Sequence, residues 1–228
     1  MTERHKVFLY AIYAIVSFLV IFPLVFVVYQ SFLAAPIYEP SALTFSNYSK
    51  LLGDVGFYNV LANTAIFSIA SATFSVLISI VMAVVIIRTN VPFKSTLETM
   101  MLVPIFVPPV TAAIMWSIFL GPAGYLTVFW KGLYGGEPWE LYGLPGMILV
   151  SVLYYTPYSF LFISSALKSM DPSLEESSRV AGAGVFRTMF RVTLPLMKTA
   201  IVFSVILMLI MGIDQFSIPL VLGVPRGV

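Results

Sequence analysis

The sequence is poor in the side chains that carry out chemistry. It contains no cysteine, and its single histidine, His5, lies near the N-terminus. These absences exclude a disulfide framework and a Cys/His metal site, and an enzyme that depends on such groups is not expected. No segment has the Gly-rich pattern ending in Gly-Lys-Ser/Thr that cradles nucleotide phosphates, so the chain is not expected to bind ATP or any other cofactor.

Charge is also scarce. Charged residues make up 10% of the 228 residues, and the formal net charge of +2 is too small to indicate a nucleic-acid partner. Hydrophobic residues make up 60%, and the mean hydropathy is +1.00. A soluble fold cannot bury so much apolar surface, whereas a lipid bilayer can cover it. The composition therefore predicts an all-α integral membrane protein.

Long uncharged runs define the expected spans, because a bilayer core needs roughly 20 apolar residues in a helix. Four runs meet this length, and a fifth holds 15 residues between Lys198 and Asp214. The fifth can span if Lys198 reaches the inner interface and the helix continues past Asp214. We therefore expect at least five spans, at about 7–33, 57–87, 97–120, 143–167 and 196–217.

The distribution of basic residues predicts a cytoplasmic N-terminus. With that orientation, the three basic residues outside are Lys50, Lys131 and Arg226, and the other nine of the twelve lie inside. The outer loops, 34–54 and 121–140, are rich in proline, glycine and tyrosine, which favours membrane anchoring over an external partner. Five spans would leave the C-terminus outside, so the chain looks C-terminally truncated.

Candidates for a translocation path are few. Pro104, Pro108 and Pro109 interrupt the third expected span, and Pro157 lies beside Tyr155 in the fourth. Prolines free backbone carbonyls that can face a cavity, but kinking for helix packing is the favoured interpretation.

Asp214 is a sharper candidate, because an ionisable residue at membrane depth is often functional. It could equally end a span at the outer interface, and both interpretations remain open.

The segment 171–195 is unusual because it is charged and yet lies between two apolar runs. Asp171-Pro172 is a good helix start, and Ser173 with Glu176 offers an alternative capping box. Glu175 and Arg179 stand four apart, in the order that favours a surface ion pair on a helix. Gly182 and Gly184 then predict a break.

A second short helix is expected after this break. Phe186, Met189 and Phe190 share one face of it, and Arg187 and Arg191 lie on another. One interpretation is an amphipathic helix at the lipid interface. The acidic first helix and the paired glycines favour contact with a cytoplasmic protein instead.

The same segment resembles the EAA loop in permease subunits of binding-protein-dependent ABC importers. The family pattern is Glu-Ala-Ala, three residues, Gly, nine residues, Ile-x-Leu-Pro. Here it reads Glu176-Ser177-Ser178, then Gly182, then Val192-Thr193-Leu194-Pro195, with serines in place of the alanines and valine in place of isoleucine. The resemblance covers nearly the whole chain and implies a type I ABC importer transmembrane domain with a cytoplasmic coupling helix.

The resemblance also implies partners and a location. These are a cytoplasmic ABC ATPase dimer that holds ATP and Mg, an extracytoplasmic substrate-binding protein, and a second permease half that is homologous, identical or fused. The location is a bacterial or archaeal cytoplasmic membrane. Contacts with the ATPase are expected from the loop residues Glu176, Ser177, Ser178, Gly182, Leu194 and Pro195; the spacing of Phe186, Met189 and Phe190 adds apolar anchors.

The substrate is less well defined. The stretch 216–223 resembles permeases for ferric iron, polyamines, thiamine and phosphonates. Ferric iron is the preferred expectation, because its permeases often fuse two halves in one long chain. An ion-coupled secondary transporter is the main alternative of another class.

Overall fold

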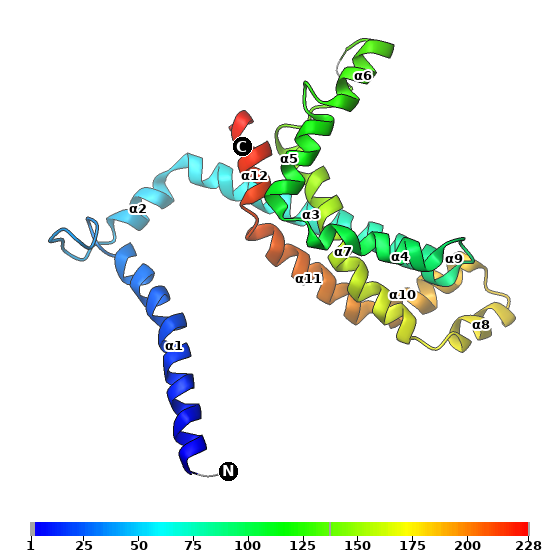
Figure 1. Ribbon diagram of the computed structural model, residues 1–228, viewed down its shortest axis with the longest axis horizontal. Helices are drawn as coiled ribbons and strands as arrows, with labels where there is room; N and C mark the ends of the chain where they lie inside the picture. The colour runs from blue at the N-terminus through cyan, green and yellow to red at the C-terminus, as the bar shows by residue number, and fades with distance from the viewer. Residues whose placement is uncertain (1–2, 137, 228) are drawn as a thin grey trace. The chain divides into compact units, whose positions relative to one another are not determined.

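The computed structural model describes residues 3–136 and 138–227. The regular secondary structure in this part of the chain is helical (Figure 1), apart from one isolated β-bridge between Leu33 and Leu43. The chain divides into two compact units, residues 1–59 and 60–228. Four helical stretches of the described residues are long and apolar enough to cross a membrane: His5–Ser31, Val55–Arg88, Pro109–Tyr134 and Leu144–Ser169. The bent pair Val185–Leu196 and Lys198–Ile213 makes a fifth candidate.

The first unit is built around α1 (Glu3–Ser31), which is apolar on all sides. Its membrane-length stretch is not buried within the chain, as suits a helix whose solvent is lipid. The segment that follows is ordered by polar side chains. The Asn47 Nδ2 donates to the carbonyls of Ser31 and Leu33 at 3.0 and 2.9 Å, which satisfies the end of α1. Helix α2 (Ser46–Gly53) follows.

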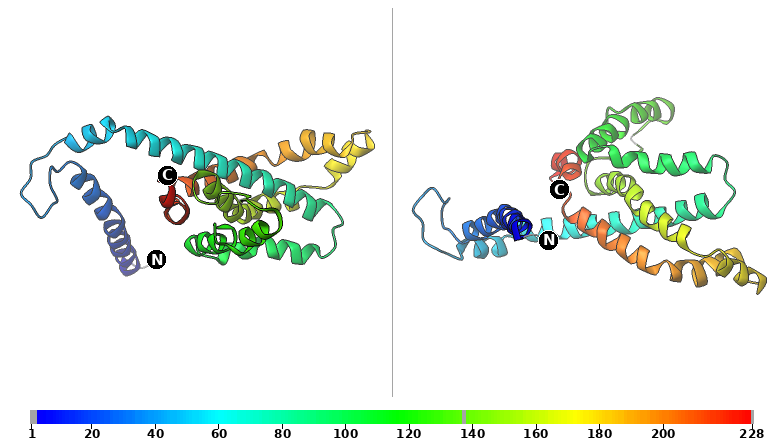
Figure 2. Two further views of the ribbon diagram at one scale, coloured as in Figure 1. Left: turned by 90° about the horizontal axis from the view of Figure 1, so that it is seen from above. Right: turned by 60° about the horizontal axis from the view of Figure 1, so that its bottom comes forward.

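The second unit has three long helices at its centre. They are α3 (Val55–Arg88), which starts at the end of the first unit, α7 (Leu144–Ser169) and α11 (Lys198–Ile213). Figure 2 shows α7 and α11 running beside each other, and the ring of Phe162 meets that of Phe203 edge-on at 5.0 Å. The Tyr155 hydroxyl donates to the Met211 carbonyl at 3.1 Å.

Small residues let α3 approach its neighbours closely. Ser68, Ser71, Ser75 and Ser79 recur at spacings of three and four, and all are buried. A side chain at Gly212 of α11 would lie 3.0 Å from the Cα of Ser68, so only glycine fits there without a shift. Such packing replaces the hydrophobic driving force that helices lack in lipid.

The third expected span, 97–120, is not one helix. It is divided into α4 (Lys94–Leu102), a 3₁₀ turn η1 (Val103–Phe106) and α5 (Pro109–Leu120). Val107 and Pro108 are extended, with ψ of 125° and 144°. Prolines lack the amide that a continuous helix needs, which explains the break.

The segment expected as the second outer loop contains α6 (Tyr125–Tyr134). The Trp139 indole donates to the Leu120 carbonyl and to Thr127 Oγ1, both at 3.0 Å, and so ties the end of this segment to the end of α5. The proline, glycine and tyrosine content of 121–140 predicted a loop but did not reveal this helix.

The fifth span also differs from its expected form. Helix α11 ends at Ile213 and is followed by a turn and by α12 (Ser217–Leu222) and η3 (Val224–Arg226), so the helix does not continue past Asp214. Gln215 holds the turn: its Nε2 donates to the Tyr155 hydroxyl at 3.2 Å, and its Oε1 accepts from the Ser217 amide at 3.3 Å.

Candidate functional site: the 171–195 loop

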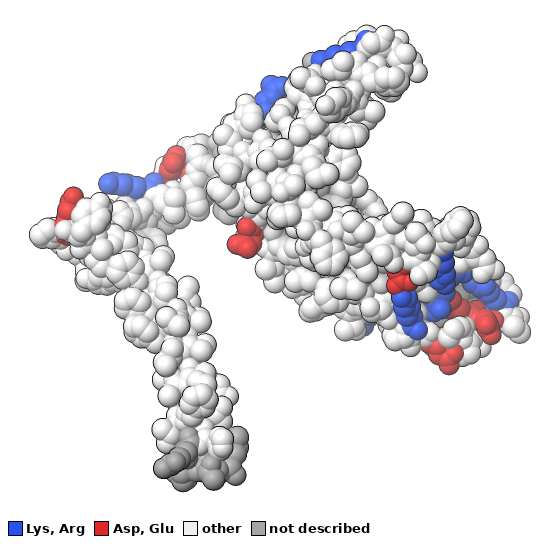
Figure 3. Space-filling view, in the orientation of Figure 1, with Lys and Arg blue, Asp and Glu red and all other residues white. Residues whose placement is uncertain are grey.

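The 171–195 loop joins α7 to α11 and carries most of the charge at its end of the second unit (Figure 3). It contains α8 (Ser173–Val180), α9 (Val185–Thr188), a π-helical turn η2 (Met189–Thr193) and α10 (Leu194–Leu196). The sequence prediction of two short helical arms separated by a glycine break therefore describes this segment correctly.

The start of α8 is fixed by Asp171. Its Oδ1 accepts the Ser173 amide at 2.9 Å, so this cap forms in place of the alternative capping box. The Ser173 amide stabilises the charged carboxylate and holds the pKa of Asp171 below its ordinary value. The expected helix start is confirmed, and its strength depends on the ionised form of Asp171.

The end of α8 is fixed by Gly182. Its φ of +85° is a left-handed conformation that other residues adopt at a cost. The Gly182 amide donates to the Arg179 carbonyl at 2.9 Å, and the Ala183 amide donates to the Ser178 carbonyl at 3.1 Å. This pair of bonds is a Schellman motif, in which glycine is the usual left-handed residue. The glycine of the EAA-like pattern thus ends α8 by satisfying its last carbonyls.

The second arm carries exposed apolar side chains. Phe186 is 76% exposed and Phe190 is 62% exposed, whereas Met189 is half-buried. Leu194 is half-buried and Pro195 is exposed, and Pro195 lies at the start of α10, where its missing amide costs nothing. Two large exposed aromatic rings outside the expected spans are therefore available to a partner.

The outer side of α8 is polar. Glu176 and Ser177 are exposed and border an open hollow of 450 Å³ together with Ser173, Val180 and Ala181. Ser178 is turned inward, and its hydroxyl lies 3.1 Å from that of Thr188. The expected contact residues therefore divide into an exposed set and the half-buried Ser178, Met189 and Leu194, of which Ser178 joins the two arms.

Glu175 does not form the expected surface pair with Arg179. It is 6% exposed, and its Oε2 lies 3.1 Å from the Nε of Arg88. Thr193 also donates to its Oε1 at 2.8 Å. Arg88 offers a planar, permanently charged partner at the end of α3, and this outcompetes an exposed i,i+4 pair. The interpretation of Glu175 as a surface residue was wrong.

A signal for this inward position existed in the sequence. Glu175 and Ser178 are three apart and so share a side of α8, while Glu176 lies on another. Nothing in the sequence named Arg88 as the partner, because it lies 87 positions away.

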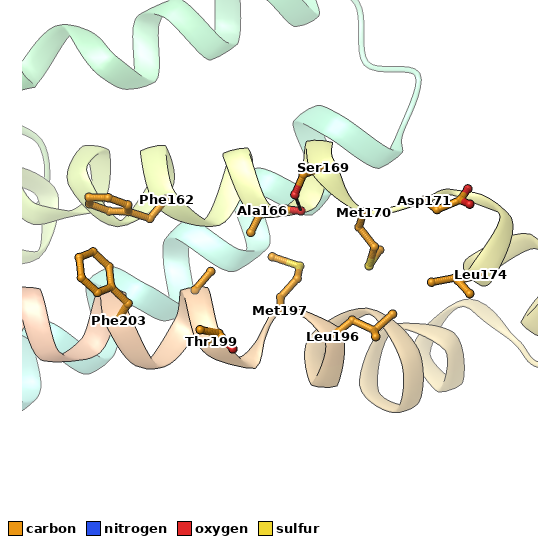
Figure 4. Close-up of a pocket in the computed structure, with 11 residues that line it drawn as sticks. Phe162, Ala166, Ser169, Met170, Asp171, Leu174, Leu196, Met197, Thr199 and Phe203 are labelled. Carbon is orange, nitrogen blue, oxygen red and sulfur yellow. Dashed lines mark hydrogen bonds between the residues drawn. The ribbon is translucent and has the colours of Figure 1, made fainter.

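A groove of 590 Å³ lies where the loop meets the spans, between α7 and the α10–α11 segment (Figure 4). Phe162 and Phe203 face each other in it, and Met170 and Met197 follow toward the loop. Asp171 and Leu174 stand at its loop end. The start of α8 therefore borders open space on the side of Asp171 and Leu174.

The path candidates lie in different environments. Tyr155 has no exposed surface and makes the hydrogen bonds with Met211 and Gln215 described above. Pro108 and Asp214 are exposed. Asp214 follows the last residue of α11, and its amide donates to the Ile210 carbonyl at 3.1 Å. A role in the path stays a prediction for all three.

Known permease proteins resemble this chain in sequence. The chain is 28% identical, over 94% of its length, to the ferric transport system permease protein FbpB of Actinobacillus pleuropneumoniae, of which it covers 31%. It is 27% identical, over 73% of its length, to the molybdenum transport system permease protein ModB of Escherichia coli K12, of which it covers 72%. The chain thus spans less than a third of the ferric permeases that it matches.

The fold is also shared with a solved structure. A bacterial ABC transporter involved in the import of the acidic polysaccharide alginate aligns with a TM-score of 0.72 and 19% identity, covering 94% of this chain and 80% of that chain. Residues 75–228 match the family described as binding-protein-dependent transport system inner membrane component. The resemblance seen in the 171–195 loop is confirmed: this chain belongs to that family, the permeases of type I ABC importers.

Proposed function

We propose that this chain is a permease subunit of an ATP-driven solute importer and that its 171–195 loop docks into a separate cytoplasmic ABC ATPase. The observation that carries the proposal is the outward side of the loop. There Glu176 and Ser177 border a hollow, and Phe186 and Phe190 stand exposed beyond the Gly182 turn. A rigidly capped surface that combines a carboxylate, a hydroxyl and two aromatic rings is of the mixed polar and apolar kind that docks into a groove of another protein.

In this proposal the permease transmits work and carries out no reaction. ATP and Mg are held by the ATPase dimer, whose closure moves the loop and, through it, the spans. A second permease half and an extracytoplasmic binding protein complete the importer, and the N-terminus lies in the cytoplasm. One solved relative was crystallised with an alginate pentasaccharide-bound periplasmic protein, which supports the binding-protein partner.

For the substrate we infer ferric iron. The FbpB similarity covers nearly the whole of this chain and supports this inference. Molybdenum, sulfate and sn-glycerol-3-phosphate are the competing substrates, because other relatives are named as permeases for them. Polyamines, thiamine and phosphonates are further alternatives from the 216–223 stretch.

The test is reconstitution in proteoliposomes with a second permease half, a candidate ABC ATPase and a candidate binding protein. We expect uptake of radiolabelled ferric iron that requires ATP and the binding protein, and that is not reduced by excess molybdate, sulfate or glycerol-3-phosphate. Uptake driven by an ion gradient without the ATPase would instead identify a secondary transporter. ATP-dependent uptake of one competitor would keep the importer and reject iron.

A further inference from the structure

The 171–195 loop is continuous in sequence with α7 and α11, but it is joined to α3 by side chains. The residue that makes this connection is Arg88, the last residue of α3. It lies 87 positions from Glu175 in the chain. A movement of the loop therefore reaches α7 and α11 through the backbone, and it reaches α3 through Arg88.

The guanidinium of Arg88 is held on two sides. Its Nε lies 3.3 and 3.1 Å from the two carboxylate oxygens of Glu175. Its Nη2 donates to the Leu167 carbonyl at 3.0 Å and approaches the Met170 carbonyl at 3.5 Å. One planar group thus binds the start of α8 and the end of α7 together. Only arginine offers donors in such a fork, so lysine is not an equivalent replacement.

Glu175 is in turn tied to the second arm. Thr193 donates to its Oε1 at 2.8 Å, and five residues earlier Thr188 meets Ser178 of α8. Both threonines are buried. Residues five apart lie about 140° apart around an α-helix of 3.6 residues per turn, so a regular helix would turn one of them away. The π-helical turn η2 has wider i→i+5 bonding and brings both hydroxyls to α8.

We propose that Arg88, Glu175 and Thr193, here called the Arg88 cluster, are positioning residues that make the loop and α3 move as one body. The inference rests on the proposed function, because it assumes that the loop receives the movement of an ATPase. The ion pair of the cluster is largely buried, both of its partners make further hydrogen bonds, and it includes both arms of the loop. Energetic coupling carried by such an element changes a linked equilibrium by about 5–150-fold.

The experiment uses the absence of cysteine in the chain. Spin labels are attached to cysteines introduced at Thr89 and Arg179, which are exposed at the end of α3 and on α8 and are not among the residues proposed to contact the ATPase. Their distance distribution is measured in proteoliposomes containing the whole importer. Arg88→Met and Glu175→Gln are compared with Glu98→Gln, a matched control. The control removes the carboxylate that pairs α4 with Lys168 of α7, without touching the loop.

We expect a narrow distribution in the parent and in Glu98→Gln. In Arg88→Met and Glu175→Gln it broadens, and the substrate moved per ATP hydrolysed falls about tenfold while the ATPase still co-purifies. Arg88→Lys keeps the charge but loses the fork, and gives an intermediate ratio. A narrow distribution in both cluster variants, or a broad one with parental transport per ATP, overturns the proposal. An ATPase that fails to bind the parent protein overturns the proposed function instead.

Discussion

Gly182 offers a test that separates backbone conformation from contact with a partner. Its φ of +85° is left-handed, yet a Cβ added at this position would meet nothing within 4 Å in the chain. The cost of Gly182→Ala inside the chain is therefore conformational alone, about 1–2 kcal/mol. That cost lowers the population of the capped turn by a factor of about 5–30.

Asparagine and aspartate visit the left-handed region more easily, because their short polar side chains bond locally. Gly182→Asn and Gly182→Asp should therefore keep the Schellman turn and still fill the space beside it. We expect Gly182→Ala to weaken transport by about 5–30-fold, in line with the turn population. We expect Gly182→Asn and Gly182→Asp to abolish transport while membrane insertion stays intact, because the ATPase occupies that space.

The assay is ATP-dependent substrate uptake in proteoliposomes, with co-purification of the ATPase and resistance of the permease to protease as the two controls. Transport by Gly182→Asn equal to the parent would show that only the backbone conformation matters at this position. Normal uptake by Gly182→Asp would refute the docking of the loop altogether.

Other contacts give four further predictions. Glu176→Lys reverses an exposed charge and should abolish transport but not insertion, as measured by uptake and membrane fractionation; normal uptake contradicts the docking surface. The pKa of Asp171 is lowered, so its helix cap is fully formed above the ordinary pKa of aspartate and is lost as the pH falls through the lowered pKa. A spin label at Ser177 should therefore gain mobility as the pH falls over that range. An Asp171→Ala variant should show no such pH dependence. Gly212→Val places side-chain atoms against Ser68 and should destabilise the fold by about 1–3 kcal/mol in thermal unfolding, with unchanged stability as the contrary result. Asp214 puts a negative charge at the C-terminal end of α11, where the helix dipole is also negative, so Asp214→Asn should stabilise the protein by about 0.3–1 kcal/mol. A simultaneous loss of ferric iron uptake would assign Asp214 to the translocation path. Unchanged uptake would reject that role.

Features set by neighbouring residues could be predicted from the sequence. The Asp171 cap and the Gly182 turn depend on hydrogen bonds within five positions. The uncharged runs likewise predicted the long helices, because a single segment that crosses lipid must satisfy its backbone hydrogen bonds within itself, as an α-helix does. The EAA-like spacing identified the family for the same reason: its pattern lies within one short loop.

Features set by distant residues could not be predicted. The partner of Glu175 is at the end of another helix, and a local i,i+4 rule pointed to Arg179 instead. The end of α11 depends on Gln215 and on Tyr155, which lies 60 positions earlier. The break between α4 and α5 had a visible cause in Pro108 and Pro109, but the prolines could not say whether the segment would kink or divide.

The opposed sides of α8 have a consequence for how such a protein changes over time. Glu175 and Ser178 are bound inside the chain, whereas Glu176 and Ser177 are exposed. Substitutions of the outer side chains leave the contacts of Glu175 and Ser178 intact, so the two sides can vary independently. In the proposed importer, a lineage could adapt to a different ATPase by exchanging the outer residues alone, while the route by which movement reaches the membrane is inherited unchanged.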